Sequence, residues 1–169
     1  MKKISLKTLF PALFCALLLA GCGFQLRGSA SLPFDSVYVQ APASSQFAVQ
    51  LKRTIASGSN ARVVEKPKEA AATLIIVTEL REKSILSLSG AGRVREFQLR
   101  YRVSYRMLDK DARETIPLTE IALNRDFSFN DQDTLSKESE ESLLYRDMQN
   151  DAVRQLVRRL QIVKPAASS

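Results

Sequence analysis

The strongest constraint on the fold is a strict alternation of apolar and polar residues over positions 95–107. The apolar positions are Phe97, Leu99, Tyr101, Val103, Tyr105 and Met107, and between them lie Gln98, Arg100, Arg102, Ser104 and Arg106. A period of two over this length predicts a β-strand with one apolar and one basic face. At ~3.3 Å per residue the strand spans ~40 Å, against ~5–6 residues for a usual strand. We expect it to form a hairpin with residues 73–88 across the turn that contains Gly90 and Gly92.

The remaining patterns supply two helices and two further strands. They predict strands at 36–40 and 115–129, the latter with Pro117 at an edge or bulge, a helix at 45–57, and a short extended piece at 61–65. Asp131 and Asp133 can cap a last helix over about 134–161, whose apolar face repeats every four residues. The predicted fold class is α+β, a two-layer domain with two helices packed on one face of a mostly antiparallel four-stranded sheet, in the order β-α-β-β-β-α.

The N-terminus has the order of a bacterial lipoprotein signal. Lys2, Lys3 and Lys7 precede an apolar run of about a dozen residues, whereas a membrane-spanning helix needs ~20. The string Leu19-Ala20-Gly21-Cys22 then resembles a lipobox, in which the cysteine sulfur receives a diacylglyceryl group and the freed amine a third acyl chain. We expect residues 1–21 to be a cleaved signal peptide and Cys22 to be the lipidated residue.

The anchor also predicts a location and the extent of the domain. One acyl chain holds a protein only marginally, whereas three hold it firmly to a membrane. Gly23 follows the cysteine, and the absence of an Asp there indicates the outer membrane, facing the periplasm. We expect an acylated N-terminus and tether over 22–33, a single α+β domain over 34–162 and a tail over 163–169.

Composition removes the residues on which many active sites depend. The chain has no histidine, and its two cysteines, Cys15 and Cys22, fall in the signal and at the anchor. The commonest general base, the commonest metal ligand and a thiolate site are therefore missing, and we predict no cofactor and no metal. Three of the 25 Lys and Arg residues belong to the signal, so the mature chain carries 22 against 18 acidic residues, a formal charge of +4. This mild charge does not indicate a nucleic-acid partner.

Several short motifs resemble one known family. Cys22-Gly23-Phe24-Gln25-Leu26-Arg27-Gly28 is similar to the start of mature LptE proteins, the lipopolysaccharide-assembly lipoproteins of the outer membrane. Glu96-Phe97-Gln98, Phe127-Ser128-Phe129-Asn130-Asp131 and the stretch 152–160 agree with that family in order and spacing. The resemblance implies a non-enzymatic subunit that forms a complex with the LptD β-barrel, assists its assembly and plugs its lumen. It also implies that the subunit binds lipopolysaccharide and helps to insert it into the outer leaflet.

Lipopolysaccharide carries anionic phosphates beside acyl chains, and arginine and lysine bind phosphate by charge and hydrogen bonds. Arg93 and Arg95 flank the Gly92 loop, and Lys137 opens the last helix where the family motif also carries a basic residue. These three are the candidate lipopolysaccharide-binding residues. The competing interpretation is that each of them is an ordinary solvent-exposed side chain with no ligand. Arg100, Arg102 and Arg106 can likewise be read either as phosphate-binding residues or as a solvated strand face.

Two alternative functions remain open at this point. One is a lipid-anchored periplasmic hydrolase that acts on the cell wall, for which Glu96 and Glu120 are candidates only because they are acidic. The other is a structural lipoprotein that binds peptidoglycan. Co-purification with a large barrel protein would favour the lipopolysaccharide-assembly function over both.

Overall fold

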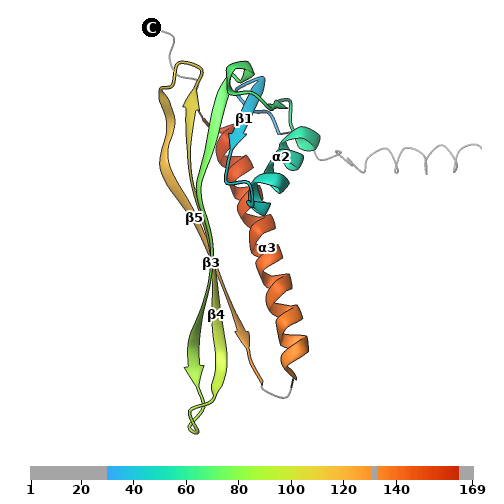
Figure 1. The fold of residues 1–169 in the computed structure, drawn as a ribbon, viewed down its shortest axis with the longest axis vertical. Helices are drawn as coiled ribbons and strands as arrows, with labels where there is room; N and C mark the ends of the chain where they lie inside the picture. The colour runs from blue at the N-terminus through green and yellow to red at the C-terminus, as the bar shows by residue number, and fades with distance from the viewer. Residues whose placement is uncertain (1–29, 131–132, 164–169) are drawn as a thin grey trace, which may run out of the picture.

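A computed structural model describes residues 30–130 and 133–163 of the chain. The elements, in chain order, are β1 (Ser36–Gln40), α2 (Gln46–Gly58), β2 (Arg62–Val64), the 3-10 helix η1 (Pro67–Glu69), β3 (Ala72–Leu88), β4 (Val94–Asp109), β5 (Glu114–Ser128) and α3 (Thr134–Gln161). Three long strands and the long helix α3 run side by side along one axis (Figure 1). The lipidation candidate Cys22 and the cap candidate Asp131 lie outside the described residues.

The sheet has five strands in the order β2-β1-β3-β4-β5, so the predicted four-stranded sheet is wrong in number. It is also mixed, because β1 pairs in parallel with both β2 and β3, while β3, β4 and β5 are antiparallel. The extra strand is the extended piece at 61–65, which pairs through Ser36 with Arg62 and Val37 with Val63. Three residues are too few to show a period of two, and the parallel pairing depends on α2 as the crossover.

The hairpin of β3 and β4 accounts for most of the length of the molecule. The hairpin partner expected at 73–88 is the strand β3, with a register shift between Ile76 and Thr78 that leaves one extra residue. The edge strand β5 also shifts, because Tyr105 faces Thr119 while Met107 faces Ile116. The bulge predicted at Pro117 is thereby confirmed, since proline donates no ladder hydrogen bond.

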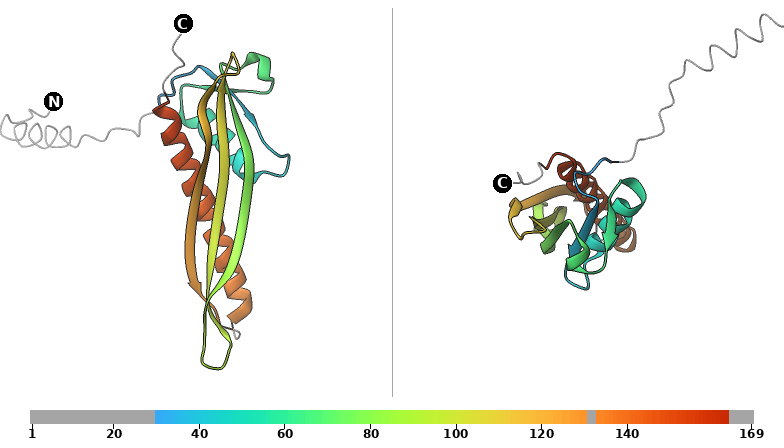
Figure 2. Two further views of the ribbon diagram at one scale, coloured as in Figure 1. Left: turned by 90° about the vertical axis from the view of Figure 1, so that its left-hand side faces the viewer. Right: turned by 90° about the horizontal axis from the view of Figure 1, so that it is seen from above.

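Both helices cover the same face of the sheet, as predicted (Figure 2). Ser45 is the N-cap of α2, and its hydroxyl accepts a hydrogen bond from the Ala48 amide at 3.0 Å. The inward residues Tyr101, Val103 and Leu156 are fully buried, which confirms the predicted apolar faces of β4 and α3. The buried residues of the described core lie between Leu32 and Leu160.

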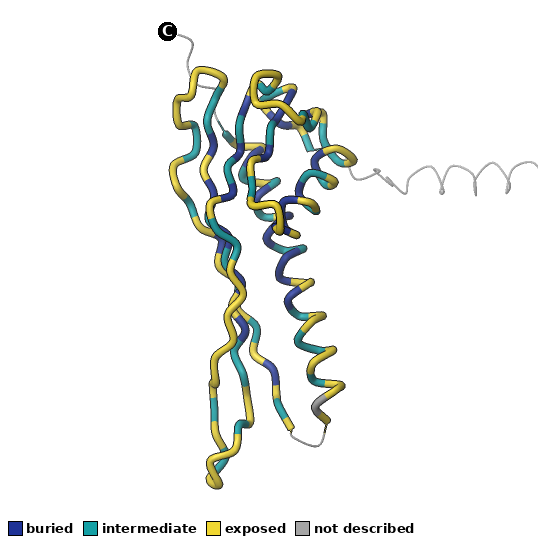
Figure 3. Tube along the Cα trace, viewed as in Figure 1, coloured by how far each residue is buried: buried dark blue, intermediate teal, exposed yellow. Residues whose placement is uncertain are grey.

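The two ends of the molecule differ in how well they are covered. The broad end comprises β1, β2, α2, the β4–β5 turn and the C-terminal end of α3. The hairpin end comprises the β3–β4 turn, the strand segments that lead into it, the C-terminal end of β5 and the first turns of α3. Buried residues concentrate toward the broad end, and exposed ones toward the hairpin end (Figure 3).

Beyond its first few residues β3 is an edge strand. Its last pairing with β1 joins Gln40 to Ile75. Farther along, Glu79 accepts hydrogen bonds from the Ser45 hydroxyl at 2.5 Å and the Tyr101 hydroxyl at 2.8 Å. At the next part of the edge, the Tyr145 hydroxyl of α3 donates to the backbone carbonyl of Glu82 at 2.7 Å. A side chain of α3 therefore occupies the backbone of this edge at Glu82.

Candidate functional site

The β3–β4 turn forms the tip of the hairpin end, as the sequence predicted for residues 89–95 (Figure 1). The Ser89 amide donates to the Arg93 carbonyl at 2.7 Å, and the Gly92 amide donates to the Ser89 carbonyl at 2.9 Å. Gly92 has a φ of 73°, a left-handed conformation that favours glycine. The turn therefore holds a defined shape while the side chains of Arg93 and Arg95 are exposed.

Arg95 borders a shallow cavity of about 340 Å³ at this end, together with Ser87, Leu88, Glu96 and Ser128. The backbone fixes its position, because the Phe129 amide donates to the Arg95 carbonyl at 2.7 Å. Glu96 is engaged within the cavity, where it accepts a hydrogen bond from the Ser87 hydroxyl at 2.7 Å. Arg95 is the cation that this cavity offers to an anionic ligand.

Lys137, on α3, approaches Ser128, one of the residues that line this cavity. Its ammonium donates to the Ser128 hydroxyl at 3.3 Å and to the Glu140 carboxylate at 2.8 Å. Arg95 and Ser128 line one cavity and Lys137 bonds to Ser128, whereas Arg93 lies in the turn. The side chain of Lys137 is only 19% exposed, so a ligand has to displace Glu140 to use its full charge.

An aromatic cluster closes the space between α3 and the sheet beside this site. The ring of Phe97 stacks on Phe127 at 5.7 Å between centroids and meets Phe129 edge-on at 5.2 Å. Lys83 extends over Phe97, with its ammonium 4.2 Å from the ring centroid, and bonds to the Glu141 carboxylate at 2.6 Å. Sequence reasoning missed Lys83, although its register opposite Leu99 places it on the inward face of the hairpin.

Large aliphatic side chains are exposed where β3 approaches the tip. Ile85 is 57% exposed, Leu86 47% and Leu88 56%. This stretch is exposed because it extends beyond most of the helical layer (Figure 1). Exposed cations and exposed aliphatic groups therefore lie together at the hairpin end. This combination suits an amphiphile with an anionic head group.

The arginines on the outer face of β4 are engaged by their neighbours. The Nε of Arg102 lies 3.2 Å from Glu82 on β3, and its Nη1 lies 3.7 Å from Glu120 on β5. Arg100 donates to the Asn124 side chain at 3.3 Å. These contacts favour the interpretation of a self-paired, solvated strand face over a phosphate site for these two arginines.

Comparison with known proteins identifies the family. The model of the LptE family, described as lipopolysaccharide-assembly, matches residues 34–160. The chain belongs to the LptE family. It is 28% identical over 153 residues to the LPS-assembly lipoprotein LptE of Photorhabdus laumondii, which covers 89% of this chain and 82% of that protein. The LptE of Yersinia enterocolitica is 29% identical over 154 residues, covering 89% of this chain and 73% of that protein.

Solved structures of lipoproteins agree with the LptE-family fold described above. The solution NMR structure of a lipoprotein B from Nitrosomonas europaea matches with a TM-score of 0.73 and 47% sequence identity, over 82% of this chain and 90% of that one. The crystal structure of the rare lipoprotein B from Shewanella oneidensis matches with a TM-score of 0.64 and 21% identity, over 75% of this chain and 93% of that one. The second likeness concerns the fold alone.

In this LptE-family domain the two carboxylates considered for a hydrolase are far apart. Glu96 lies on β4 at the hairpin end, while Glu120 faces Ser104, so the two are separated by about 26 Å along the sheet at ~3.3 Å per residue. Glycosidase carboxylates lie ~5–9.5 Å apart. Within residues 30–130 and 133–163, no group of three or more His, Cys, Asp or Glu residues could hold a metal ion. No helix in those ranges combines the length and apolarity needed to cross a bilayer.

Proposed function

We propose that this LptE-family lipoprotein binds lipopolysaccharide at its hairpin end and works as a non-enzymatic subunit of a complex with the LptD β-barrel. In this complex it assists assembly of the barrel, plugs its lumen and helps to insert lipopolysaccharide into the outer leaflet. The observation that carries the proposal is the juxtaposition of Arg93, Arg95 and Lys137 with the exposed Ile85, Leu86 and Leu88.

The proposed recognition uses both parts of lipopolysaccharide. Arg95 and Lys137, which meet at Ser128, bind a phosphate group, and Arg93 adds charge from the turn. The aliphatic side chains of β3 contact the acyl chains, and this contact is favourable because it removes apolar surface from water. Because each exposed ion pair contributes only ~0–1 kcal/mol, no single cation is expected to decide the affinity.

The shape and polarity of the domain support the proposed place inside a barrel. The outer face of the sheet carries cross-strand polar pairs such as Arg102 with Glu82 and Gln98 with Asp126. Barrel lumens are polar, so a long, narrow domain with such a face can lie against a lumen wall without burying unpaired charges. We propose that Cys22 carries the lipid that holds the protein to the outer membrane on the periplasmic side.

The binding site is tested by charge reversal in the chain that begins at residue 23, which keeps the whole core. The variant Arg93→Asp, Arg95→Asp, Lys137→Asp should bind lipopolysaccharide at least tenfold more weakly, with a larger deficit at low salt because screening weakens the charge effect. The matched control is Arg62→Asp, Lys66→Asp, Lys68→Asp, which makes the same charge change at the broad end. Equal affinity of the two triple variants would reject the site, and a deficit independent of salt would reject the charge mechanism.

The barrel complex is tested in cells and in membrane extracts. Depleting the protein should leave the barrel misassembled and reduce surface lipopolysaccharide, and solubilised membranes should yield a stoichiometric complex. Cys22→Ala should abolish incorporation of labelled fatty acid, because the thiol is the acyl acceptor. Normal barrel assembly and normal surface lipopolysaccharide after depletion would contradict the proposed function, and equal labelling of the Cys22→Ala variant would contradict the anchor.

A further inference from the structure

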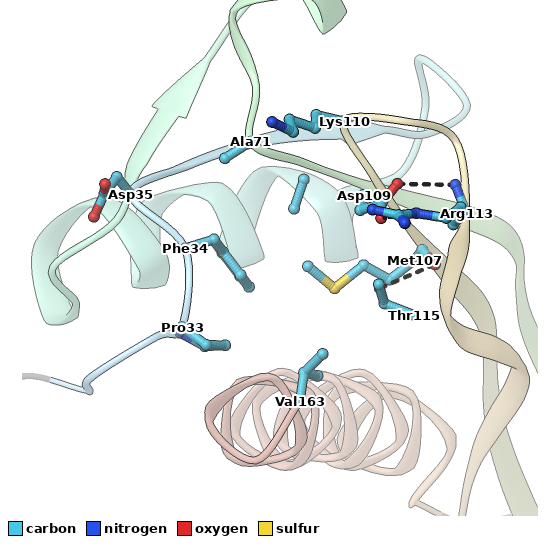
Figure 4. A pocket seen from close by; sticks show the side chains of 11 residues that line it. Pro33, Phe34, Asp35, Ala71, Met107, Asp109, Lys110, Arg113, Thr115 and Val163 are labelled. Atoms are coloured by element: carbon cyan, nitrogen blue, oxygen red, sulfur yellow. Dashed lines mark hydrogen bonds and ion pairs between the residues drawn. The ribbon is translucent and has the colours of Figure 1, made fainter. Parts of the chain in front are cut away.

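A second cavity lies at the opposite, broad end of the molecule, between the segment before β1, the β4–β5 turn and the end of α3 (Figure 4). Its volume is about 280 Å³, and it is partly open to solvent. The described chain enters at this end, where the Ala30 amide donates to the Gly58 carbonyl at 2.7 Å. The cavity is therefore near the point from which the N-terminal tether leaves the domain.

The floor of this cavity is apolar and continuous with the core. Phe34, Pro33 and Val163 surround it, and Met107, which is only 1% exposed, forms its base (Figure 4). Phe34 and Val163 are partly buried and pack against the core cluster. Covering these groups with an apolar side chain or an acyl chain would be favourable, because it would remove apolar surface from water.

The mouth of the cavity carries two pairs of opposite charges. Arg113 is fully engaged, since its guanidinium bonds to Asp109 and to Asp111, each at 2.9 Å. Lys110 and Asp35 also line the cavity, and neither makes a side-chain hydrogen bond or ion pair with the described residues. One uncommitted cation and one uncommitted anion therefore flank an apolar floor.

We propose that this cavity binds one acyl chain of a membrane phospholipid with a zwitterionic head group, the phosphate facing Lys110 and the ammonium facing Asp35. Ligand pockets usually measure ~300–1,000 Å³, so a cavity of about 280 Å³ takes part of a single chain and not a whole lipid. Because the mouth of the cavity carries one uncommitted cation and one uncommitted anion, it favours a zwitterionic head group over a simple anion. Such a lipid would hold the broad end against the membrane surface beside the anchor.

The experiment uses tryptophan as a local reporter, because the chain contains none. Phe34→Trp places an indole in the cavity, and Val49→Trp places the matched control on α2, at a side chain that is 41% exposed. Both variants are made in the chain that begins at residue 23. The ligand is a lysophosphatidylethanolamine with a brominated acyl chain, kept below its micelle concentration, since bromine quenches indole fluorescence at contact.

Saturable quenching of Trp at position 34 without quenching at position 49 is the expected result. Lys110→Glu should weaken the apparent affinity about three- to tenfold, as an exposed charge contact allows, while Lys66→Glu at the same end should not change it. Val163→Phe should abolish quenching by filling the cavity, whereas Ile162→Phe, one residue earlier and 80% exposed, should preserve it. Absent quenching, or equal quenching at both positions, would overturn the proposal.

Two further quenching measurements test whether something else occupies the cavity. If quenching at position 34 begins only after deletion of residues 164–169, the cavity holds the chain's own tail and the proposal is wrong. The acylated protein is then placed in nanodiscs of phosphatidylethanolamine with brominated chains, where quenching at position 34 is expected to persist. If Trp at position 34 is protected from quenching in the acylated protein but not in the unacylated chain, the cavity holds the protein's own acyl chain. That result would overturn the phospholipid proposal.

Discussion

The two ends of this domain share one sheet and one helix but are stabilised in different ways. At the broad end α3 packs through Met148, Leu156 and Leu160, all of them fully buried, with α2 beside it. At the hairpin end α3 contacts the sheet through Lys83 with Glu141 and through the aromatic cluster around Phe97. The comparison indicates that the broad end holds the fold together, which leaves the hairpin end free to expose cations and aliphatic groups.

A polar layer separates the two ends. Arg81 on β3 donates to the Gln149 side chain at 2.9 Å, and Gln149 in turn donates to Gln50 on α2 at 2.7 Å. Gln149 is only 8% exposed, and a buried amide is costly unless its donors and acceptors are paired. This layer therefore fixes the relative position of α2, α3 and β3 within the core.

The largest effect is expected in the core of the broad end. Leu156→Ala should lower the free energy of unfolding by ~2–5 kcal/mol, because it removes buried methyl groups and leaves a cavity. Chemical denaturation measures this change. Leu143→Ala on the same helix, at a side chain that is 53% exposed, is the control. Similar losses in the two variants would contradict the assignment of the buried face of α3.

A smaller and more local effect is expected at the hairpin end. Phe97→Ala should cost ~1–3 kcal/mol, less than for a fully buried phenylalanine, since this ring is partly exposed but makes two aromatic contacts. Hydrogen exchange should accelerate in residues 84–98 and remain unchanged in β1 and α2. A uniform acceleration across the domain would show that the two ends are one cooperative unit.

The edge contact of β3 is expected to contribute less again. Tyr145→Phe removes the hydroxyl that donates to the Glu82 carbonyl, at a cost of ~0.5–1.5 kcal/mol. Burial, and next the charge of Glu141, raise the pKa of Tyr145. The protonated hydroxyl therefore stabilises the wild-type protein fully below about pH 10, and this stabilisation is lost as the pH rises further. The difference in unfolding midpoint between wild type and variant should shrink above that pH. A constant difference up to pH 12 would contradict this account.

The two hairpin turns should differ in their response to acid. At the broad end, the backbone amide of Arg113 and then its guanidinium, opposed by partial desolvation, hold the pKa of Asp109 below its usual value. The stabilisation is present above about pH 4 and is lost as the pH falls through the lowered value. Protection factors at residues 109–113, which are corrected for the intrinsic pH dependence of amide exchange, should fall in acid and should no longer depend on pH in Asp109→Asn. The β3–β4 turn, whose closing contacts include the Ser89 hydroxyl, serves as the reference.

Periodicity predicted most of the fold because the long elements bury one face along much of their length. The alternation of β4 and the spacing on α3 correspond to residues that are buried in one core cluster, such as Tyr101 and Leu156. Arg62–Val64 is too short to carry a pattern, so the fifth strand and the parallel pairing could not be derived. The inward face of the last residues of β3 could not be derived, because from Ser84 onward the strand is largely exposed.

The candidate site could be predicted only in part. Local sequence identified Arg95 in the turn and Lys137 at the start of α3, but their meeting at Ser128 depends on where α3 returns to the sheet. Lys83 was missed because its role comes from two phenylalanines and a glutamate that are distant in sequence.

The exposed edge of β3 has a consequence for the life of the protein before it meets a partner. A long, unpaired strand edge is a template on which another chain can add a strand and begin to aggregate. Here the Tyr145 hydroxyl occupies the Glu82 carbonyl, and the run Arg81-Glu82-Lys83 places charges along the same stretch. Charged edges and blocked carbonyls discourage such addition. The stretch of β3 around Glu82 is thus protected against strand addition, and the last described residues of the strand are left more open to a neighbour.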